Sequence, residues 1–199
     1  MDSDNSVNNY NLTITGDNST FQDYSDPDPA TYFRNISLQH FCADPIQMVT
    51  KHKQFKELCL ANGNPEAHYI EGLLQFFLED NIGNDLYHLR QSSNGNNENS
   101  TYLYGLLNLA LGKYRKGKKC LDKLNWRDNI STSDHCWERI KNSLRDIRSE
   151  WTHDYYTNMV NLQPWPHCHP QDNMALICNK CYYYKRLNQL YEFATKDDY

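Results

Sequence analysis

Apolar residues recur at steps of three and four along most of the chain, a spacing typical of amphipathic helices. The most apolar stretch, about 65–79, predicts a helix that is buried between its neighbours. Gly63 suits the left-handed position just past a helix end, and Asn64 suits the cap of the next helix. The pattern therefore ends a helix over about 45–61 and begins another within three residues.

The stretch around Gly72 has a fainter copy around Gly105, a spacing of 33 residues. In both copies a small residue lies five places before the glycine and bulky apolar residues surround it, which lets two helices pack closely. A period near 33 residues is the length of a helical hairpin. We therefore expect two stacked hairpin repeats, over about 64–95 and 97–124.

Further helical segments flank the repeats and would cover the two ends of their stack. The amphipathic pattern that runs from Trp137 to Trp151, with Ser133 or Asp134 as its cap, would begin a C-terminal cap over 133–195. Three prolines predict an irregular segment over 152–176. The expected helices span about 45–61, 65–79, 85–91, 99–111, 114–124, 133–151 and 180–194. The predicted fold is an all-α, short tetratricopeptide-like helical hairpin repeat domain with capping helices and an irregular Cys/His/Pro-containing loop near the C-terminus.

Composition separates residues 1–31 from the domain expected over 32–199. No Lys or Arg precedes Arg34, whereas Asp, Asn and Ser are frequent there. Such a segment buries too little apolar surface to offset the entropy of ordering, so we expect a disordered acidic tail.

The net charge of −5 and the pI near 5.9 disfavour general binding to nucleic acid. No apolar run is long enough to span a bilayer, so no membrane partner is expected.

The seven cysteines follow no secretory signal and are interpreted as reduced thiols or metal ligands in a cytoplasmic or nuclear protein. Cys178 and Cys181 form a Cys-x2-Cys pair that suits adjacent corners of a zinc tetrahedron, and Cys168 is a candidate third ligand. His167, His169 or the distant Cys136 would complete the set. One structural zinc is thus possible, and buried free thiols are the alternative.

Other residue patterns indicate binding rather than catalysis. The chain has no Gly-x-Ser-x-Gly, no phosphate-binding glycine loop and no His-Glu-x-x-His, so no enzyme activity is expected. The lysine-rich segment 113–123 is interpreted as a solvated outer face, with a contact for an acidic partner as the alternative. Tyrosines at helical spacing are interpreted as core residues whose hydroxyls reach the edge of the core: Tyr69, Tyr102, Tyr104 and Tyr183.

Four segments resemble a plant F-box protein family with C-terminal tetratricopeptide-like repeats of the Sel-like class: Asn64–Gly72, Gly117–Leu124, Cys136–Leu144 and Cys178–Lys185. The resemblance covers about residues 35–195. It implies an N-terminal F-box that docks on the Skp adaptor of a cullin-based ubiquitin ligase, and repeats that recruit a target. Because residues 1–34 are acidic and nearly devoid of Leu, no F-box and no Skp partner are expected in this chain.

These observations predict a non-catalytic protein–protein interaction module with an unknown target protein. It would resemble the target-recruiting region of a ubiquitin ligase adaptor. The alternatives are a folded fragment without function and a small zinc-dependent nucleic-acid-binding protein. The nucleic-acid-binding alternative would use Cys168, Cys178 and Cys181 for the metal and the basic face of 113–123 for phosphates.

Overall fold

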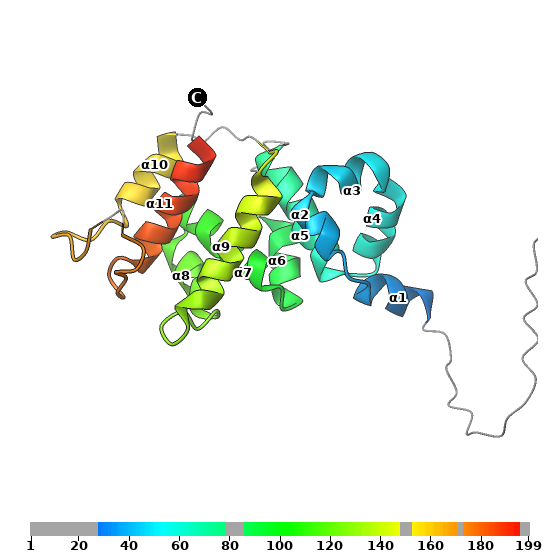
Figure 1. Cartoon of the computed structure of the whole chain (residues 1–199), viewed down its shortest axis with the longest axis horizontal. Coiled ribbons are helices and arrows are strands. Elements are labelled where there is room, and N and C mark those ends of the chain that lie inside the picture. The colour runs from blue at the N-terminus through cyan, green and yellow to red at the C-terminus, as the bar shows by residue number, and fades with distance from the viewer. Residues whose placement is uncertain (1–27, 79–85, 148–152, 171–172, 196–199) are drawn as a thin grey trace, which may run out of the picture.

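A computed structural model describes residues 28–78, 86–147, 153–170 and 173–195 (Figure 1). These residues form eleven helices and no strand, which confirms the predicted all-α class. The helices are α1 (Pro29–Asn35), α2 (Gln39–Ala43), α3 (Pro45–Lys51), α4 (Lys53–Ala61), α5 (Pro65–Phe77), α6 (Tyr87–Asn94), α7 (Glu98–Ala110), α8 (Tyr114–Asp122), α9 (Ile130–Leu144), α10 (His153–Val160) and α11 (Tyr182–Thr195).

The helices are arranged as an elongated stack that broadly follows the chain order (Figure 1). α1, α3 and α4 lie at one end, and α10 and α11 lie at the other. Two antiparallel hairpins, α5 with α6 and α7 with α8, occupy the middle, and α6 also packs against α7. The hairpins fall within the repeats expected over 64–95 and 97–124.

Each hairpin closes on a glycine. A Cβ atom placed on Gly72 would lie 2.7 Å from Cγ of Leu89 in α6, and one placed on Gly105 would lie 2.7 Å from Cγ of Leu121 in α8. The absence of these side chains lets the return helix approach the backbone. Each glycine therefore contacts the return helix of its own hairpin, and α6 packs against both glycine-bearing helices.

Helix α7 is the most enclosed element of the stack. Every residue from Ser100 to Ala110 is buried, and α7 packs against α6, α8, α9, α10 and α11. Two of its polar side chains have partners inside the core. The Ser100 hydroxyl donates to Oγ of Ser92 at 2.6 Å, and the Asn108 amide donates to the Tyr104 carbonyl at 2.6 Å. These bonds allow a helix with several polar residues to lie at the centre.

The prediction of a single helix over 45–61 is wrong, because the helix is interrupted at His52 and forms α3 and α4 instead. Neither glycine nor proline marks this break. His52 leaves the helical region of backbone space, and its ring packs 5.0 Å from the ring of Phe41, measured between centroids. A contact with a residue eleven positions earlier thus accompanies the break.

Three further boundaries differ from expectation. Residues 153–160 form α10 inside the segment expected to be irregular, with Tyr155 and Met159 buried on one face. Helix α9 begins at Ile130, so Ser133 lies inside it and its hydroxyl pairs with the Tyr182 hydroxyl at 2.8 Å instead of capping the helix. Helix α6 continues to Asn94, three residues beyond the end of the helix expected over 85–91.

Some expectations fall outside the described residues. They include the turn between the helices expected over 65–79 and 85–91, Trp151 and residues 1–27 of the tail. Within the described part of the chain, α1 begins at Pro29, inside the expected tail. None of the described helices combines the length and apolar character needed to cross a lipid bilayer. All seven cysteines are free thiols.

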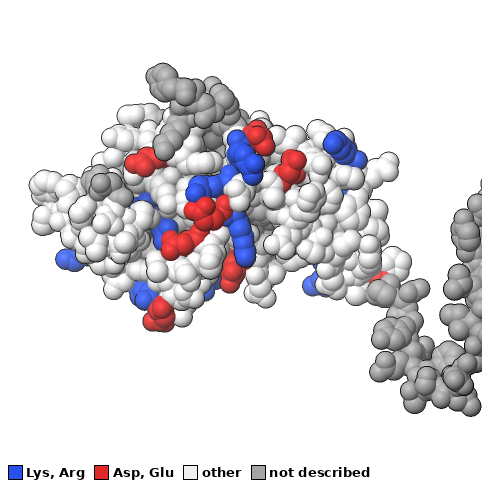
Figure 2. Space-filling view, viewed as in Figure 1, with Lys and Arg blue, Asp and Glu red and all other residues white. Residues whose placement is uncertain are grey.

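Charges of both signs are interspersed on the face of the molecule shown in Figure 2. The Lys, Arg, Asp and Glu residues there gather in the middle of the stack, while the surface on either side is mostly uncharged. Helix α9 contributes such a pair, in which Lys141 bonds Glu138 at 2.8 Å. This face carries no broad positive surface of the kind that nucleic acid requires.

Candidate functional site

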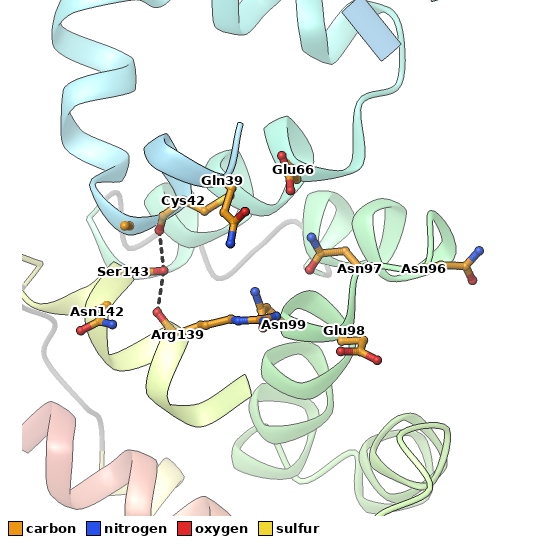
Figure 3. Close-up of a pocket in the computed structure, with 11 residues that line it drawn as sticks. Gln39, Cys42, Glu66, Asn96, Asn97, Glu98, Asn99, Arg139, Asn142 and Ser143 are labelled. Atoms are coloured by element: carbon orange, nitrogen blue, oxygen red, sulfur yellow. Dashed lines mark hydrogen bonds between the residues drawn. The ribbon is translucent and has the colours of Figure 1, made fainter. Parts of the chain in front are cut away.

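A groove of about 610 Å³ lies between α2, α9 and the N-terminal ends of α5 and α7 (Figure 3). Its size is within the range of ligand-binding clefts. Polar side chains dominate the lining, and five of them are amides. The lining residues are Gln39, Cys42, Ala43, Glu66, Asn96, Asn97, Glu98, Asn99, Arg139, Asn142 and Ser143.

Two asparagine side chains cap α5 and α7, whose N-terminal ends form the floor of the groove. Asn64 Oδ1 accepts hydrogen bonds from the backbone N–H groups of Glu66 and Ala67, at 2.9 and 3.1 Å. Asn97 Oδ1 accepts from the Ser100 N–H at 2.9 Å. Capping in this way satisfies N–H groups that would otherwise have no partner at a helix start. Both helices therefore begin at the groove, and their first turns carry the carboxylates of Glu66 and Glu98 into its lining.

The walls are joined to this floor by side-chain bonds. The Glu66 carboxylate accepts from the backbone N–H of Leu38, the residue that precedes α2. On the opposite wall, the Ser143 hydroxyl of α9 lies 2.6 Å from the Cys42 carbonyl oxygen of α2 (Figure 3). It also lies 3.0 Å from the Tyr69 hydroxyl of α5. Three helices distant in sequence are thereby fixed around one concavity.

Arg139 and Asn99 lie side by side in the groove, and each has a polar group without a partner in the part of the chain that the structure describes. Arg139 is exposed, and its side chain extends across the groove toward Asn99 (Figure 3). Among the described residues, no ion pair involves its guanidinium. Asn99 Oδ1 is buried without a hydrogen-bond partner in the same part of the chain. A bound group would thus find the positive charge of Arg139 available here.

The chemistry of the lining favours binding over reaction. Burial, reinforced by the nearby Glu66 carboxylate, raises the pKa of the Cys42 thiol far above its usual value. This thiol is therefore protonated at neutral pH and is a poor nucleophile. Apart from Ala43, the remaining lining residues carry amide, hydroxyl, carboxylate or guanidinium groups, which suits recognition of a polar ligand.

The structure brings four of the sequence-predicted metal ligands together. The ligand atoms of Cys168, His169, Cys178 and Cys181 all lie within 4.8 Å of one another. Cys136 is not among them: it is fully buried in α9, where desolvation raises the pKa of its thiol to about 12. His167 also lies outside the cluster and packs near the ring of Trp165.

The basic segment 113–123 forms α8 and its flanks. Two of its lysines cover tyrosine rings, with Lys116 5.0 Å from the Tyr104 centroid and Lys118 5.1 Å from the Tyr183 centroid. Arg115, Lys119 and Lys123 are exposed. This arrangement is consistent with a solvated face whose inner lysines also pack against aromatic rings.

Only part of the groove is marked by local sequence signals. Asn64 has the sequence signal of a helix cap, and Asn97 with Glu98 in the second repeat carries the same signal 33 residues later. No local signal marks Arg139 or Ser143, because their role depends on how α9 crosses the two hairpins.

Comparison with known proteins gives one family and one curated relative. The family of plant tetratricopeptide repeats matches residues 38–147. An F-box protein of Arabidopsis thaliana is 38% identical over 76 residues, which are 38% of this chain and 47% of that protein. The chain thus spans about half the length of this relative. No solved structure matches. The family match contains every residue that lines the groove and excludes the cysteine and histidine cluster.

Proposed function

The chain belongs to the family of plant tetratricopeptide repeats, and we propose that it is a non-catalytic protein-interaction module. Its target would be held in the groove between α2, α5, α7 and α9. The observation that carries this proposal is the groove itself, a polar concavity built by both hairpins and α9. Stacked helical repeats commonly use such a concave surface to bind a partner.

The lining favours an extended segment of a target protein that bears a carboxylate. Asn and Gln side chains each donate and accept hydrogen bonds, so the groove amides match the alternating N–H and C=O groups of an extended backbone. Arg139 supplies a guanidinium whose planar donors suit a carboxylate. The Glu66 carboxylate is occupied by α2 and Glu98 is negative, so Arg139 is the lining residue that would pair with a carboxylate of the target.

The likeness to an F-box protein supports a more specific role. We propose that the repeats recruit a target protein for a ubiquitin ligase, as the resemblance of the repeat segments implies. The support is the 38% identity to that relative over 76 residues, together with a groove that suits a protein segment.

A charge reversal in the groove tests the proposal. Tagged wild-type protein, Arg139→Glu and Arg145→Glu would be used to capture partners from a plant extract, and the recovered target would then be measured as a purified protein. Both arginines are exposed, Arg139 in the C-terminal half of α9 and Arg145 directly after its last residue, but only Arg139 lines the groove. We expect Arg139→Glu to weaken target binding at least tenfold and Arg145→Glu to leave it unchanged.

Equal binding by the two variants would rule out the groove as the target site. The ligase role has its own readout, namely whether the Skp adaptor and a cullin accompany the target. A target that is recovered reproducibly without them would limit the function to protein interaction.

A further inference from the structure

We propose that Cys168, His169, Cys178 and Cys181 bind one structural zinc ion. The four ligand atoms converge on one point of the C-terminal loop. The Cys178 sulfur lies 3.7 Å from the Cys168 sulfur and 3.9 Å from the Cys181 sulfur, and the Cys181 sulfur lies 3.6 Å from Nδ1 of His169. All four ligands lie outside the residues that match the repeat family, so this site is independent of the proposed target groove.

These separations are those of a zinc tetrahedron. Zn–S bonds of about 2.3 Å and Zn–N bonds of about 2.0 Å, held at tetrahedral angles, place two sulfurs about 3.8 Å apart and a sulfur and a nitrogen about 3.5 Å apart. The three measured separations agree with these values within about 0.2 Å, the tolerance expected of a metal site. The sulfurs are too far apart for a disulfide, whose S–S bond is about 2.0 Å.

The surrounding backbone holds the ligands in place. Cys178 and Cys181 lie on a turn that leads directly into α11, where the N–H groups of Cys181 and Tyr182 both donate to the Cys178 carbonyl. On the other side, the buried ammonium of Lys185 donates to three carbonyls of the loop between His169 and Cys178. These are the carbonyls of Pro170, Asn173 and Leu176.

The loop lacks a hydrophobic core of its own. Among its described residues, none from Asn161 to Cys178 is buried, and Trp165 is 87% exposed. A segment that buries so little apolar surface needs a cross-link to stay ordered. A metal bound by residues 168, 169, 178 and 181 would close the loop at its base, in addition to the bonds from Lys185 to Pro170, Asn173 and Leu176.

The donor set selects zinc among the common metals. Three thiolates and one imidazole are soft or borderline ligands that disfavour magnesium and calcium, and their tetrahedral arrangement suits zinc. All four positions are filled by protein side chains, which leaves no open position for water or substrate. The site is therefore structural rather than catalytic.

Metal analysis of the full chain tests the proposal. The protein would be purified under reducing conditions, reconstituted with zinc and measured by mass spectrometry of its metal content. We expect one zinc per chain, and cobalt in its place should give thiolate-to-cobalt charge-transfer absorption. His169→Gln and Cys181→Ser should lower zinc affinity at least tenfold. His167→Gln and Cys136→Ser, which alter the two candidate ligands outside the cluster, should still bind one zinc.

Two results would overturn the proposal. One is less than stoichiometric zinc in the reconstituted wild type. The other is an equal loss of zinc in His169→Gln and His167→Gln. Far-UV circular dichroism of each variant distinguishes the loss of a zinc ligand from failure to fold. The helices within residues 38–147 contribute no ligand, so their signal should persist when only zinc binding is lost. Binding of a target to the groove would continue in a zinc-free variant, so failure of this proposal is separable from failure of the proposed function.

Discussion

Buried tyrosines of this core differ in whether their hydroxyls find a partner. Tyr69 and Tyr102 are both fully buried, although their hydroxyls were expected to reach the edge of the core. The Tyr69 hydroxyl bonds Ser143 at 3.0 Å, whereas the Tyr102 hydroxyl is buried with no hydrogen-bond partner among the described residues. Burial raises the pKa of both phenols well above the usual value. The two sites therefore have the same side chain and opposite hydrogen-bonding status.

This contrast predicts opposite results for one substitution. Tyr69→Phe removes a buried hydrogen bond and should lower the free energy of unfolding by about 1 kcal/mol. Tyr102→Phe removes a hydroxyl that is desolvated without compensation, so it should leave stability within about 0.5 kcal/mol of wild type or raise it. Urea denaturation of the three proteins measures the difference. A larger loss for Tyr102→Phe than for Tyr69→Phe would contradict the assigned hydrogen bonds.

At the scale of the element, the hairpins depend on contact between a glycine and the facing helix. In α7 and α8, a Cβ on Gly105 would lie 2.7 Å from Cγ of Leu121 and 3.3 Å from the Gly117 carbonyl oxygen. Glycine in a helix normally costs stability relative to alanine. Here the packing requirement outweighs that intrinsic preference, which explains a glycine in the middle of the most buried helix.

We therefore expect Gly105→Ala to destabilise the protein by about 2 kcal/mol, the usual scale of overpacking. Helix propensity alone would predict a gain of about 0.5–1 kcal/mol. The matched background is Leu121→Ala, which removes the two nearest atoms that the new methyl group would meet. In that background the cost of Gly105→Ala should largely disappear, and a double-mutant cycle from thermal unfolding measures the coupling. Additive effects would show that the two residues do not clash.

At the scale of the whole molecule, α9 connects the first half of the stack to the second. It packs against α2 and α7, and its Ser143 meets both the Cys42 carbonyl and the Tyr69 hydroxyl. The stacked rings of Trp126 and Tyr182, 3.7 Å apart between centroids, join the end of the second hairpin to α11. Repeat arrays lose cooperativity when units contact only their neighbours. These longer connections oppose such a loss.

The expected consequence is a single unfolding transition. All four tryptophans follow residue 125, so their fluorescence reports the second half of the chain, while far-UV circular dichroism reports every helix. In urea the two signals should change together, because contacts of α9 join the halves. A transition in circular dichroism that precedes the change in fluorescence would show that the N-terminal helices unfold separately.

Local features of the sequence determined where helices begin and which residues are small enough for close packing. Asn64, Pro65 and Gly63 specify the start of α5, because capping depends on a few adjacent residues. The period that relates Gly72 to Gly105 likewise predicted the two hairpins. The Cys-x2-Cys spacing indicated a pair of thiols on one turn, and the structure places Cys178 and Cys181 on such a turn.

Only the tertiary structure decided the features that depend on contacts between distant residues. The break at His52 and the helix α10 have no strong local signal. His52 packs against Phe41 at the break, and α10 packs against α7. His169, rather than Cys136, lies beside the three thiols because α9 buries Cys136 elsewhere. The groove is lined by residues far apart in sequence, and the Ser143 hydroxyl bonds the carbonyl of Cys42, 101 residues earlier. Such contacts form when whole helices pack, and no short stretch of sequence encodes their geometry.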